Sequence, residues 1–290
     1  MPEKVLEGKV AVITGGGRGL GREMAVAFAE AGAAGVTVTA APGSDESAEE
    51  IEAELHETLA AIHQAGGIGL GCLAEVADEF DCQRVMAETL DAFDGFHILV
   101  NNAAKAGRYA HHGDAKMAIF EADPAGFREM IDTNILGPFL MSHAAAGPMV
   151  EAGWGRIINI SKRVDSMHRS AITPYGPSKA ALDAATIAWA EAFHGSGVTV
   201  NSLSPGGAVD TKFGTGEITG RGLDPAVIRP MAVWLASPAS DGVNGCRFTA
   251  EFWDGALAPD AAAEACREPA IFPLPARDTP IKGAWAPRRG

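Results

Sequence analysis

The stretch from Lys9 to Ala31, KVAVITGGGRGLGREMAVAFAEA, constrains the fold of this chain more than any other. Residues 10–13 are an apolar run of the kind expected for a strand buried on both faces. Residues 14–21 are rich in glycine, and a helix is predicted after them because apolar side chains recur at helical spacing. These apolar positions are Leu20, Met24, Phe28 and Ala31. A strand, a glycine loop and a helix are therefore expected in direct succession.

This succession fits a cradle for phosphate groups. Gly15, Gly19 and Gly21 permit a tight turn, close approach of the backbone to an anion, and close packing of the helix on the strand. The N–H groups and the dipole at the start of the helix attract a pyrophosphate. An ordinary glycine-rich turn is the alternative, and it is disfavoured because strand, loop and helix occur together.

Composition limits the class of protein. Of the 290 residues, 47% are hydrophobic and 21% are charged, which is typical of a globular chain with a sizeable core. The formal net charge of −14 argues against nucleic acid or an anionic membrane as a partner. No run of about eighteen apolar residues and no signal-peptide segment is present, so a cytoplasmic protein is expected. The cysteines include no C-x-x-C pair, so neither a disulfide framework nor a metal site is predicted.

Strands and helices are predicted to alternate along the rest of the chain. Further strands are expected at residues 36–39, 68–73, 98–100, 156–160, 198–203 and 247–252. Helices between successive strands imply a parallel sheet that is covered on both faces and built by right-handed crossovers. The predicted fold is α/β, a doubly wound, Rossmann-like parallel sheet of seven strands in a single domain, residues 1–258.

Two later motifs fall at informative places. Residues 101–104, Asn-Asn-Ala-Ala, follow a predicted strand, and doubly wound sheets bind ligands at the carboxyl ends of their strands. Tyr175 and Lys179 form a Tyr-x-x-x-Lys motif in the helix predicted over 171–193. Their i, i+4 spacing places phenol and ammonium on one helix face, where the cation favours the phenolate and lowers the pKa of the Tyr.

In this order, the three motifs resemble those of the short-chain dehydrogenase/reductase family, over residues 5–255. The resemblance implies a homodimer or homotetramer that moves a hydride between NAD(P)(H) and a small alcohol or carbonyl substrate. It implies that Tyr175 exchanges a proton with the substrate oxygen, that Lys179 also holds the nicotinamide ribose, and that Asn134 orders a water in the proton path. The implied cofactor contacts are Gly15, Gly17, Arg18, Gly19, Leu20, Gly21, Ala40, Glu75, Val76, Asn102, Ala103, Ala104, Tyr175, Lys179, Pro205, Gly206 and Thr211.

The end of the second predicted strand bears on the choice of dinucleotide. An acid there would accept hydrogen bonds from a ribose 2′-OH and repel a 2′-phosphate, but this chain has Ala40 and Ala41. Arg18 is a cation that can meet a 2′-phosphate, and in similar family members a basic residue at this place goes with NADP(H). NADP(H) is therefore favoured, and NAD(H) stays open if Arg18 is solvated and Asp45 turns inward. Glu75 replaces the Asp that the family commonly has beside the adenine.

One position departs from the family pattern. Where the family has a Ser that bonds the substrate oxygen, this chain has Lys162, and Ser161 precedes it. In an unbroken strand Ser161 would face away from Tyr175, although a bulge could bring it round. Otherwise Lys162 itself, or Ser166 or His168, could donate to the substrate oxygen. We expect Lys162 to point into the site and to suit an anionic substrate, a carboxylate, phosphate or enolate. A lyase, an isomerase or a weakly catalytic cofactor-binding protein on the same fold is the alternative.

Three further segments carry weaker signals. Residues 105–123 include His111 and His112, whose side chains point to different sides of a helix or strand, so a solvated loop is expected. The glycine-rich stretch 212–224 fits a mobile substrate lid or a plain flexible loop equally well. Prolines interrupt residues 259–290, which are predicted to form an extended tail packed along a surface.

Overall fold

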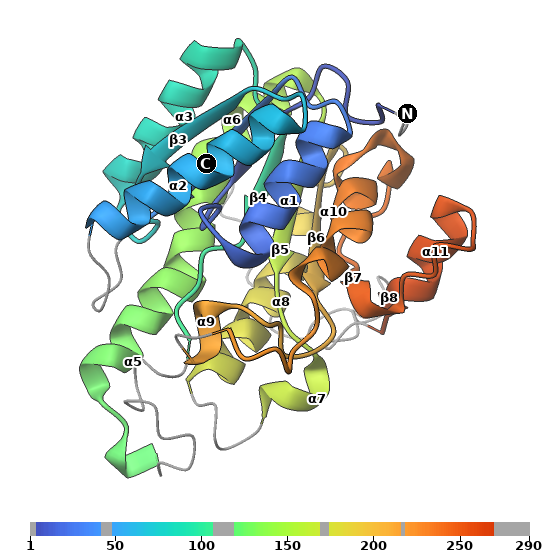
Figure 1. The fold of residues 1–290 in the computed structure, drawn as a ribbon. Helices are drawn as coiled ribbons and strands as arrows, with labels where there is room; N and C mark the ends of the chain where they lie inside the picture. The colour runs from blue at the N-terminus through green and yellow to red at the C-terminus, as the bar shows by residue number, and fades with distance from the viewer. Residues whose placement is uncertain (1–3, 42–47, 107–118, 169–173, 216–217, 270–290) are drawn as a thin grey trace, which may run out of the picture.

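One sheet of parallel strands runs through the middle of the molecule (Figure 1). The computed structural model describes residues 4–41, 48–106, 119–168, 174–215 and 218–269. The strand order is β3-β2-β1-β4-β5-β6-β7-β8, and only β8 runs antiparallel to its neighbour among these strands. The strands are β1 (Val10–Ile13), β2 (Gly35–Ala40), β3 (Gly69–Leu73), β4 (Ile98–Asn101), β5 (Gly155–Ile160), β6 (Val198–Ser204), β7 (Arg247–Thr249) and β8 (Arg267–Glu268).

Helices cover both faces of this sheet, which confirms the predicted α/β, doubly wound fold. The helices are α1 (Gly19–Glu30), α2 (Ala48–Gln64), α3 (Glu79–Phe93), α5 (Pro124–Ile131), α6 (Gly137–Ala152), α7 (Val164–Met167), α8 (Tyr175–Ala192), α9 (Lys212–Thr215), α10 (Arg229–Ala236) and α11 (Pro259–Cys266). One buried apolar cluster joins α1, α2 and α10 to the sheet, and a second joins α3, α6 and α8. Ala11 and Ile13 enter the first cluster and Val12 the second, so β1 is buried on both faces as predicted.

The strand order reverses at β1, which has β2 on one side and β4 on the other. Open α/β sheets bind ligands in the crevice that forms outside the carboxyl ends of the strands at such a reversal. The glycine loop follows β1, and the Asn-Asn-Ala-Ala segment includes the last residue of β4. The topology therefore brings these two motifs to one place.

The C-terminal region differs from the extended tail that its prolines predict. Residues 259–268 form α11 and β8. Pro259 is the first residue of α11, where its missing N–H costs no hydrogen bond. Asp260 accepts a hydrogen bond from Trp234 Nε1 at 2.9 Å, and Cys266 is buried in the first apolar cluster. The sheet therefore has eight strands where seven were predicted, and the packed unit continues beyond the expected boundary.

The other differences are small. The last predicted strand, 247–252, divides into β7 and a 3₁₀ turn at Ala250–Phe252. Asp45, the pair His111 and His112, and residues 270–290 lie outside the described residues. Within the described ranges no helix is long and apolar enough to cross a membrane. Over the same ranges, no three His, Cys, Asp or Glu side chains are grouped as metal ligands.

Candidate active site

Hydrogen bonds lock the glycine loop after β1 to the loop after β4. Asn102 Nδ2 donates to the carbonyl oxygens of Thr14 and Gly15 at 2.8 and 2.9 Å. Thr14 Oγ1 accepts hydrogen bonds from the N–H groups of Asn102 and Ala103, both at 3.0 Å. The two motifs thus form one hydrogen-bonded unit, although Thr14 and Asn102 are 88 positions apart in the sequence.

The shape of the loop depends on glycine at some positions and not at others. Gly15 and Gly19 have φ angles of 62° and 54°, in the left-handed region. A Cβ at Gly21 would lie 2.3 Å from the Gly15 carbonyl oxygen. A Cβ at Gly17 would make only ordinary contacts, the nearest at 3.6 Å to Ala40 Cβ. Side chains at Gly15, Gly19 or Gly21 would therefore strain or crowd the loop. With glycine at these positions, the backbone can approach a ligand closely.

The start of α1 is open to an anion. Its N-cap residue is Arg18, and no side chain caps the helix. The first N–H groups of the helix can therefore bind an anionic ligand. Arg22 Nη2 and Thr58 Oγ1 support the loop by donating to the Gly17 carbonyl at 2.7 and 2.8 Å. These residues fit the pyrophosphate of a dinucleotide.

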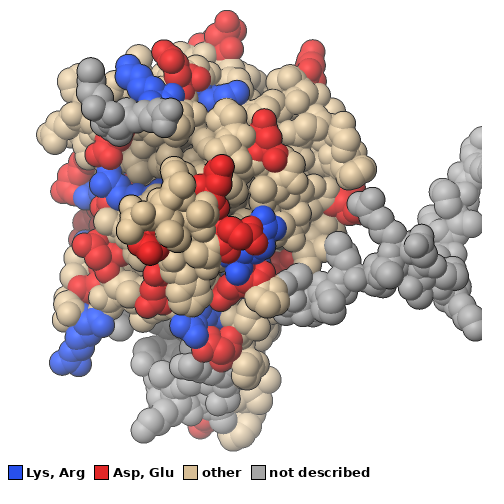
Figure 2. All heavy atoms as spheres, turned by 90° about the vertical axis from the view of Figure 1, so that its right-hand side faces the viewer, with Lys and Arg blue, Asp and Glu red and all other residues tan. Residues whose placement is uncertain are grey.

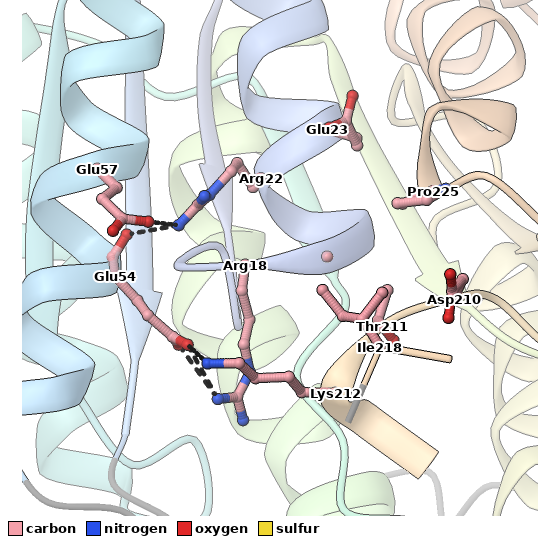
Figure 3. A pocket seen from close by; sticks show the side chains of 11 residues that line it. Arg18, Arg22, Glu23, Glu54, Glu57, Asp210, Thr211, Lys212, Ile218 and Pro225 are labelled. Carbon is pink, nitrogen blue, oxygen red and sulfur yellow. Dashed lines mark hydrogen bonds and ion pairs between the residues drawn. The ribbon is translucent and has the colours of Figure 1, made fainter. Parts of the chain in front are cut away.

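Arg18 is engaged in an ion pair, which differs from the solvated arrangement considered above. Its Nη1 lies 3.2 Å from Glu54 Oε2, and Lys212 Nζ lies 3.1 Å from Oε1 of the same carboxylate. Figure 3 shows these side chains converging beside a pocket of about 320 Å³. Glu54 belongs to α2 and Lys212 to α9, so one carboxylate links both helices to the glycine loop. Neither residue lies in a motif, and nothing in the sequence marks this contact.

Residues at the ends of β2, β3 and β4 line the same edge of the sheet. Ala40 is the last residue of β2. Val76 is buried after β3. The adjacent Glu75 accepts a hydrogen bond through Oε1 from the Ala77 N–H at 3.3 Å, so its carboxylate is engaged within its own turn. Ala104 continues the loop after β4 and is partly exposed. The adenine contact of Glu75 stays a prediction, and the structure shows only that this residue lies at the edge where β3 ends.

The segment after β6 lies over the glycine loop. Thr211 sits against Gly19, because a Cβ there would lie 3.1 Å from Thr211 Cγ2. Gly206 has a φ of 113°, and Pro205 accepts a backbone hydrogen bond from Glu251 at 3.1 Å. Two of the predicted cofactor contacts, Gly19 and Thr211, therefore lie next to each other. Leu20, the second residue of α1, packs instead against the first apolar cluster.

Tyr175, the first residue of α8, has two ammonium groups and an aromatic ring around it. Lys162 Nζ lies 5.4 Å from the centroid of the Tyr175 ring, and Lys179 Nζ lies 5.9 Å from it. The Phe213 ring of α9 is 5.7 Å away, centroid to centroid. The Tyr-x-x-x-Lys pair therefore shares a helix face, and the segment considered as a lid reaches Tyr175 through Phe213.

Burial sets the ionisation of this pair. Desolvation raises the pKa of the Tyr175 phenol above its usual range, although part of the residue's surface stays accessible. Desolvation lowers the pKa of Lys179 to about 8, and Asp183 opposes that change. Lys179 Nζ donates to the Ile160 carbonyl at 2.8 Å. In the chain by itself, burial therefore dominates the pKa of Tyr175 and acts in the direction opposite to the lowering expected from Lys179.

Ser161 is not the residue that reaches the Tyr ring. β5 ends at Ile160, and Ser161 is 3% exposed beside Asp183. Burial raises the pKa of that carboxyl, and Arg247 and the Ser161 hydroxyl oppose the change. Ser161 Oγ makes no hydrogen bond of ordinary geometry with the described residues. The Ser161 side chain therefore lies buried next to the Asp183 carboxyl, beneath the site.

The structure places the Lys162 ammonium on the side of Tyr175. Its Nζ lies near the Tyr175 ring and donates to the Ser166 carbonyl at 3.2 Å. The Ser166 hydroxyl donates to the Arg163 carbonyl at 2.8 Å, within the turn that leads into α7, and His168 is exposed. Of the candidates to replace the family's Ser, Lys162 is the one with a charged group beside Tyr175.

Asn134 lies in a π-helical segment, Asp132–Leu136, between α5 and α6. It is fully buried, and its Oδ1 accepts from the Lys105 N–H at 2.7 Å. Its Nδ2 donates to the Lys105 carbonyl at 3.1 Å and to Ser178 Oγ at 3.0 Å. Asn134 thereby joins the loop after β4 to α8 next to Tyr175. A π segment inside a helix is frequent at functional sites.

Known proteins are similar to this chain in sequence and in fold. Residues 9–219 match the family model for short chain dehydrogenase. The chain is 34% identical, over 69% of its length, to 73% of the (2S)-[(R)-hydroxy(phenyl)methyl]succinyl-CoA dehydrogenase subunit BbsD of Thauera aromatica. It is 28% identical, over 84% of its length, to 93% of the NADPH-dependent aldehyde reductase 2, chloroplastic, of Arabidopsis thaliana. The crystal structure of a short-chain type dehydrogenase/reductase from Mycobacterium marinum has a TM-score of 0.69 and 29% identity, covering 83% of this chain and 93% of that one.

Proposed function

The chain belongs to the short-chain dehydrogenase family, and from this premise we propose that it interconverts an alcohol and a carbonyl compound, with NADP(H) as preferred cofactor and Tyr175 exchanging the proton. One observation carries the proposal. Tyr175 with its two lysines and a glycine loop shaped for a pyrophosphate lie at the carboxyl edge of one sheet. The family membership supports an enzyme of the dehydrogenase or reductase kind.

The chain's own residues would hold the dinucleotide at the crevice beside β1. N–H groups of the glycine loop and of the first turn of α1 would bind the pyrophosphate, and Lys179 the nicotinamide ribose. When bound, the nicotinamide supplies or accepts the hydride. Arg18 supports NADP(H), because its guanidinium can bind a 2′-phosphate in exchange for Glu54, and Ala40 places no acid at the end of β2. NAD(H) is the second candidate.

Tyr175 is suited to donate a proton when a carbonyl is reduced. A phenol is protonated at neutral pH at its ordinary pKa of about 10, and burial raises the pKa of Tyr175 further. The ammonium groups of Lys162 and Lys179 then stabilise the phenolate that proton transfer leaves behind. In the reverse direction the phenolate takes the proton of an alcohol.

Lys162 supports an anionic substrate. A hydroxyl in its place would offer a neutral hydrogen bond, whereas the ammonium adds a full positive charge beside the Tyr175 ring. We therefore propose that the substrate carries a carboxylate, phosphate or enolate oxygen near the carbonyl. Phe213 offers an apolar wall on the side of α9.

The test measures cofactor binding first and turnover second. NADPH and NADH are titrated by protein fluorescence, and a panel of carbonyl compounds is then assayed at the reduced-nicotinamide absorbance band. The panel includes 4-oxopentanoate and its neutral methyl ester as a matched pair. We expect tighter NADPH binding, and a loss of about 10²–10⁴-fold in kcat in Tyr175→Phe with NADPH binding kept. Lys162→Ser should lower kcat/KM for the acid more than for the ester.

Three results would redirect the proposal. Undiminished turnover in Tyr175→Phe would reject the proton role of this residue. An equal loss for acid and ester in Lys162→Ser would reject the anionic substrate. Cofactor binding together with substrate conversion, seen by NMR without any change in absorbance, would instead favour a lyase or isomerase.

A further inference from the structure

Four charged side chains, three of them buried and one partly exposed, form a set beneath Lys162 and Tyr175. Lys179 and Asp183 are one turn apart on α8, Arg247 lies in β7, and Glu268 lies in β8. The side chains of Arg247 and Asp183 are each 4% exposed and form an ion pair. Arg247 Nε also lies 2.8 Å from Glu268 Oε2. Two cations thus face two carboxylates, and the set is neutral only when Glu268 is counted.

This set holds the backbone where β5 ends. Lys179 Nζ donates to the Ile160 carbonyl at 2.8 Å, and Arg247 Nη2 donates to the Lys162 carbonyl. The two carbonyls flank Ser161, so the turn that carries Lys162 toward the Tyr ring is fastened on both sides. Both hydrogen bonds have a charged donor, and the first is buried while the second is partly buried, so both are stronger than neutral hydrogen bonds at the surface.

Glu268 is the part of this set that comes from farthest along the chain. β8 has only two residues, and a strand of that length adds little stability through its own ladder. Its register places Glu268 opposite Arg247. The set holds two cations, Lys179 and Arg247, so it needs a second carboxylate besides Asp183, because an uncompensated buried charge is costly. The main contribution of β8 is therefore the carboxylate that it presents.

We propose that Arg247 and Glu268 are positioning residues for Lys162. Arg247 fixes the Lys162 carbonyl, and Glu268 orients and neutralises Arg247, so β8 completes the candidate active site. The inference rests on the proposed function, since it assigns both residues a part in the same reaction. It extends that function to a segment beyond the residues that match the family model.

The decisive variant is Glu268→Gln, which keeps the shape of the side chain and removes its charge. The matched control is Glu264→Gln in α11, which breaks the exposed Arg267–Glu264 ion pair of 2.8 Å nearby in the same segment. We expect Glu268→Gln to lower kcat for 4-oxopentanoate about tenfold, with NADPH affinity unchanged, and Glu264→Gln to leave both unchanged. Glu268→Asp keeps the charge and should recover most of the activity.

Combining the variant with Lys162→Ser separates positioning from a general loss of stability. If Glu268 acts through Lys162, Glu268→Gln should cause no further loss in the Lys162→Ser background. The same fold-loss in both backgrounds would overturn the proposal. So would a kcat for Glu268→Gln equal to that of the Glu264→Gln control.

A second readout is independent of turnover. Hydrogen exchange of the amides at residues 161–163, followed by mass spectrometry, should be about tenfold faster in Glu268→Gln than in the parent chain and unchanged in Glu264→Gln. Unchanged exchange in Glu268→Gln would reject the positioning role. If the parent chain binds NADPH but turns over no substrate in the panel, the proposed function fails while this measurement still decides the inference.

Discussion

At the scale of single residues, His97 shows how burial links ionisation to stability. Its Nδ1 accepts a hydrogen bond from the Val10 N–H at 3.1 Å, which requires the neutral ring. Burial, and then the charge of Lys9, lower the pKa of His97. The unfolded chain therefore binds a proton below about pH 6.5 that the folded chain does not, and the free energy of unfolding should fall as the pH drops below that value.

Urea unfolding measured between pH 5 and pH 8 tests this dependence. His97→Gln keeps an acceptor for Val10 and cannot titrate, so its unfolding free energy should fall less steeply below about pH 6.5. His56→Gln, on an exposed position of α2, is the control and should follow the parent chain. Parallel curves for the parent chain and His97→Gln would show that His97 is not responsible.

Single residues also show which parts of the site can be predicted from the sequence. The direction of Lys162 follows from its spacing to Tyr175 and from the end of the buried strand before it. Glu54 and Arg247 lie outside every motif, and their partners come from segments far away in the chain. Local patterns carry no signal for such pairs, because the contact exists only once the sheet is assembled.

At the scale of elements, the glycine loop should respond very differently to two similar substitutions, Gly21→Ala and Gly17→Ala. A Cβ at Gly21 would lie 2.3 Å from the Gly15 carbonyl oxygen, so Gly21→Ala must displace the backbone of the cradle. We expect NADPH affinity to fall about 100-fold or more, since the displaced N–H groups no longer converge on the pyrophosphate. Gly17→Ala meets no atom closer than 3.6 Å and should change the affinity by less than about twofold. Equal effects of the two variants, by fluorescence titration, would contradict this geometry.

The contact between α2 and the glycine loop supports a prediction about cofactor choice. The Glu54 carboxylate holds Arg18 and Lys212, where a 2′-phosphate would compete for the same guanidinium (Figure 3). Glu54→Gln should therefore tighten NADPH binding about threefold to tenfold and leave NADH binding unchanged. Glu57→Gln, which breaks the ion pair with Arg22 on the same helix, is the matched control and should change neither affinity. Weaker NADPH binding in Glu54→Gln would mean that Glu54 positions Arg18 for the phosphate.

Helices and strands that follow from apolar periodicity could be predicted from the sequence. Elements whose start or shape depends on single residues could not. β1, α1 and the strands of the central sheet follow from buried apolar runs and from helical spacing. Proline content pointed to an extended tail from residue 259, yet Pro259 begins α11 at a position that favours proline. The π segment around Asn134 has no pattern of its own, because it depends on the packing of α5 and α6 around the loop after β4.

At the scale of the whole molecule, charge is spread over the surface. On the face drawn in Figure 2, Lys and Arg side chains lie among Asp and Glu side chains and do not gather into a basic patch. The formal net charge of −14 makes copies of this chain repel one another at long range. Association of copies would therefore need an apolar surface large enough to outweigh that repulsion.

The exposed side of α6 offers such a surface, and we propose that it joins copies in a homodimer or homotetramer. Phe139 and Val150 of α6 are 48% and 46% exposed, and Leu136, directly before the helix, is 40% exposed. Burying them against a second copy removes apolar area from water without desolvating charges.

Phe139→Glu should convert the assembly to monomers in light scattering after gel filtration. Ile68→Glu, at an apolar side chain of 65% exposure just before the edge strand β3, should leave it intact. If Phe139→Glu keeps the parent mass, α6 is not the contact and the copies meet elsewhere. If the parent chain is already a monomer, repulsion between the acidic copies outweighs the apolar gain.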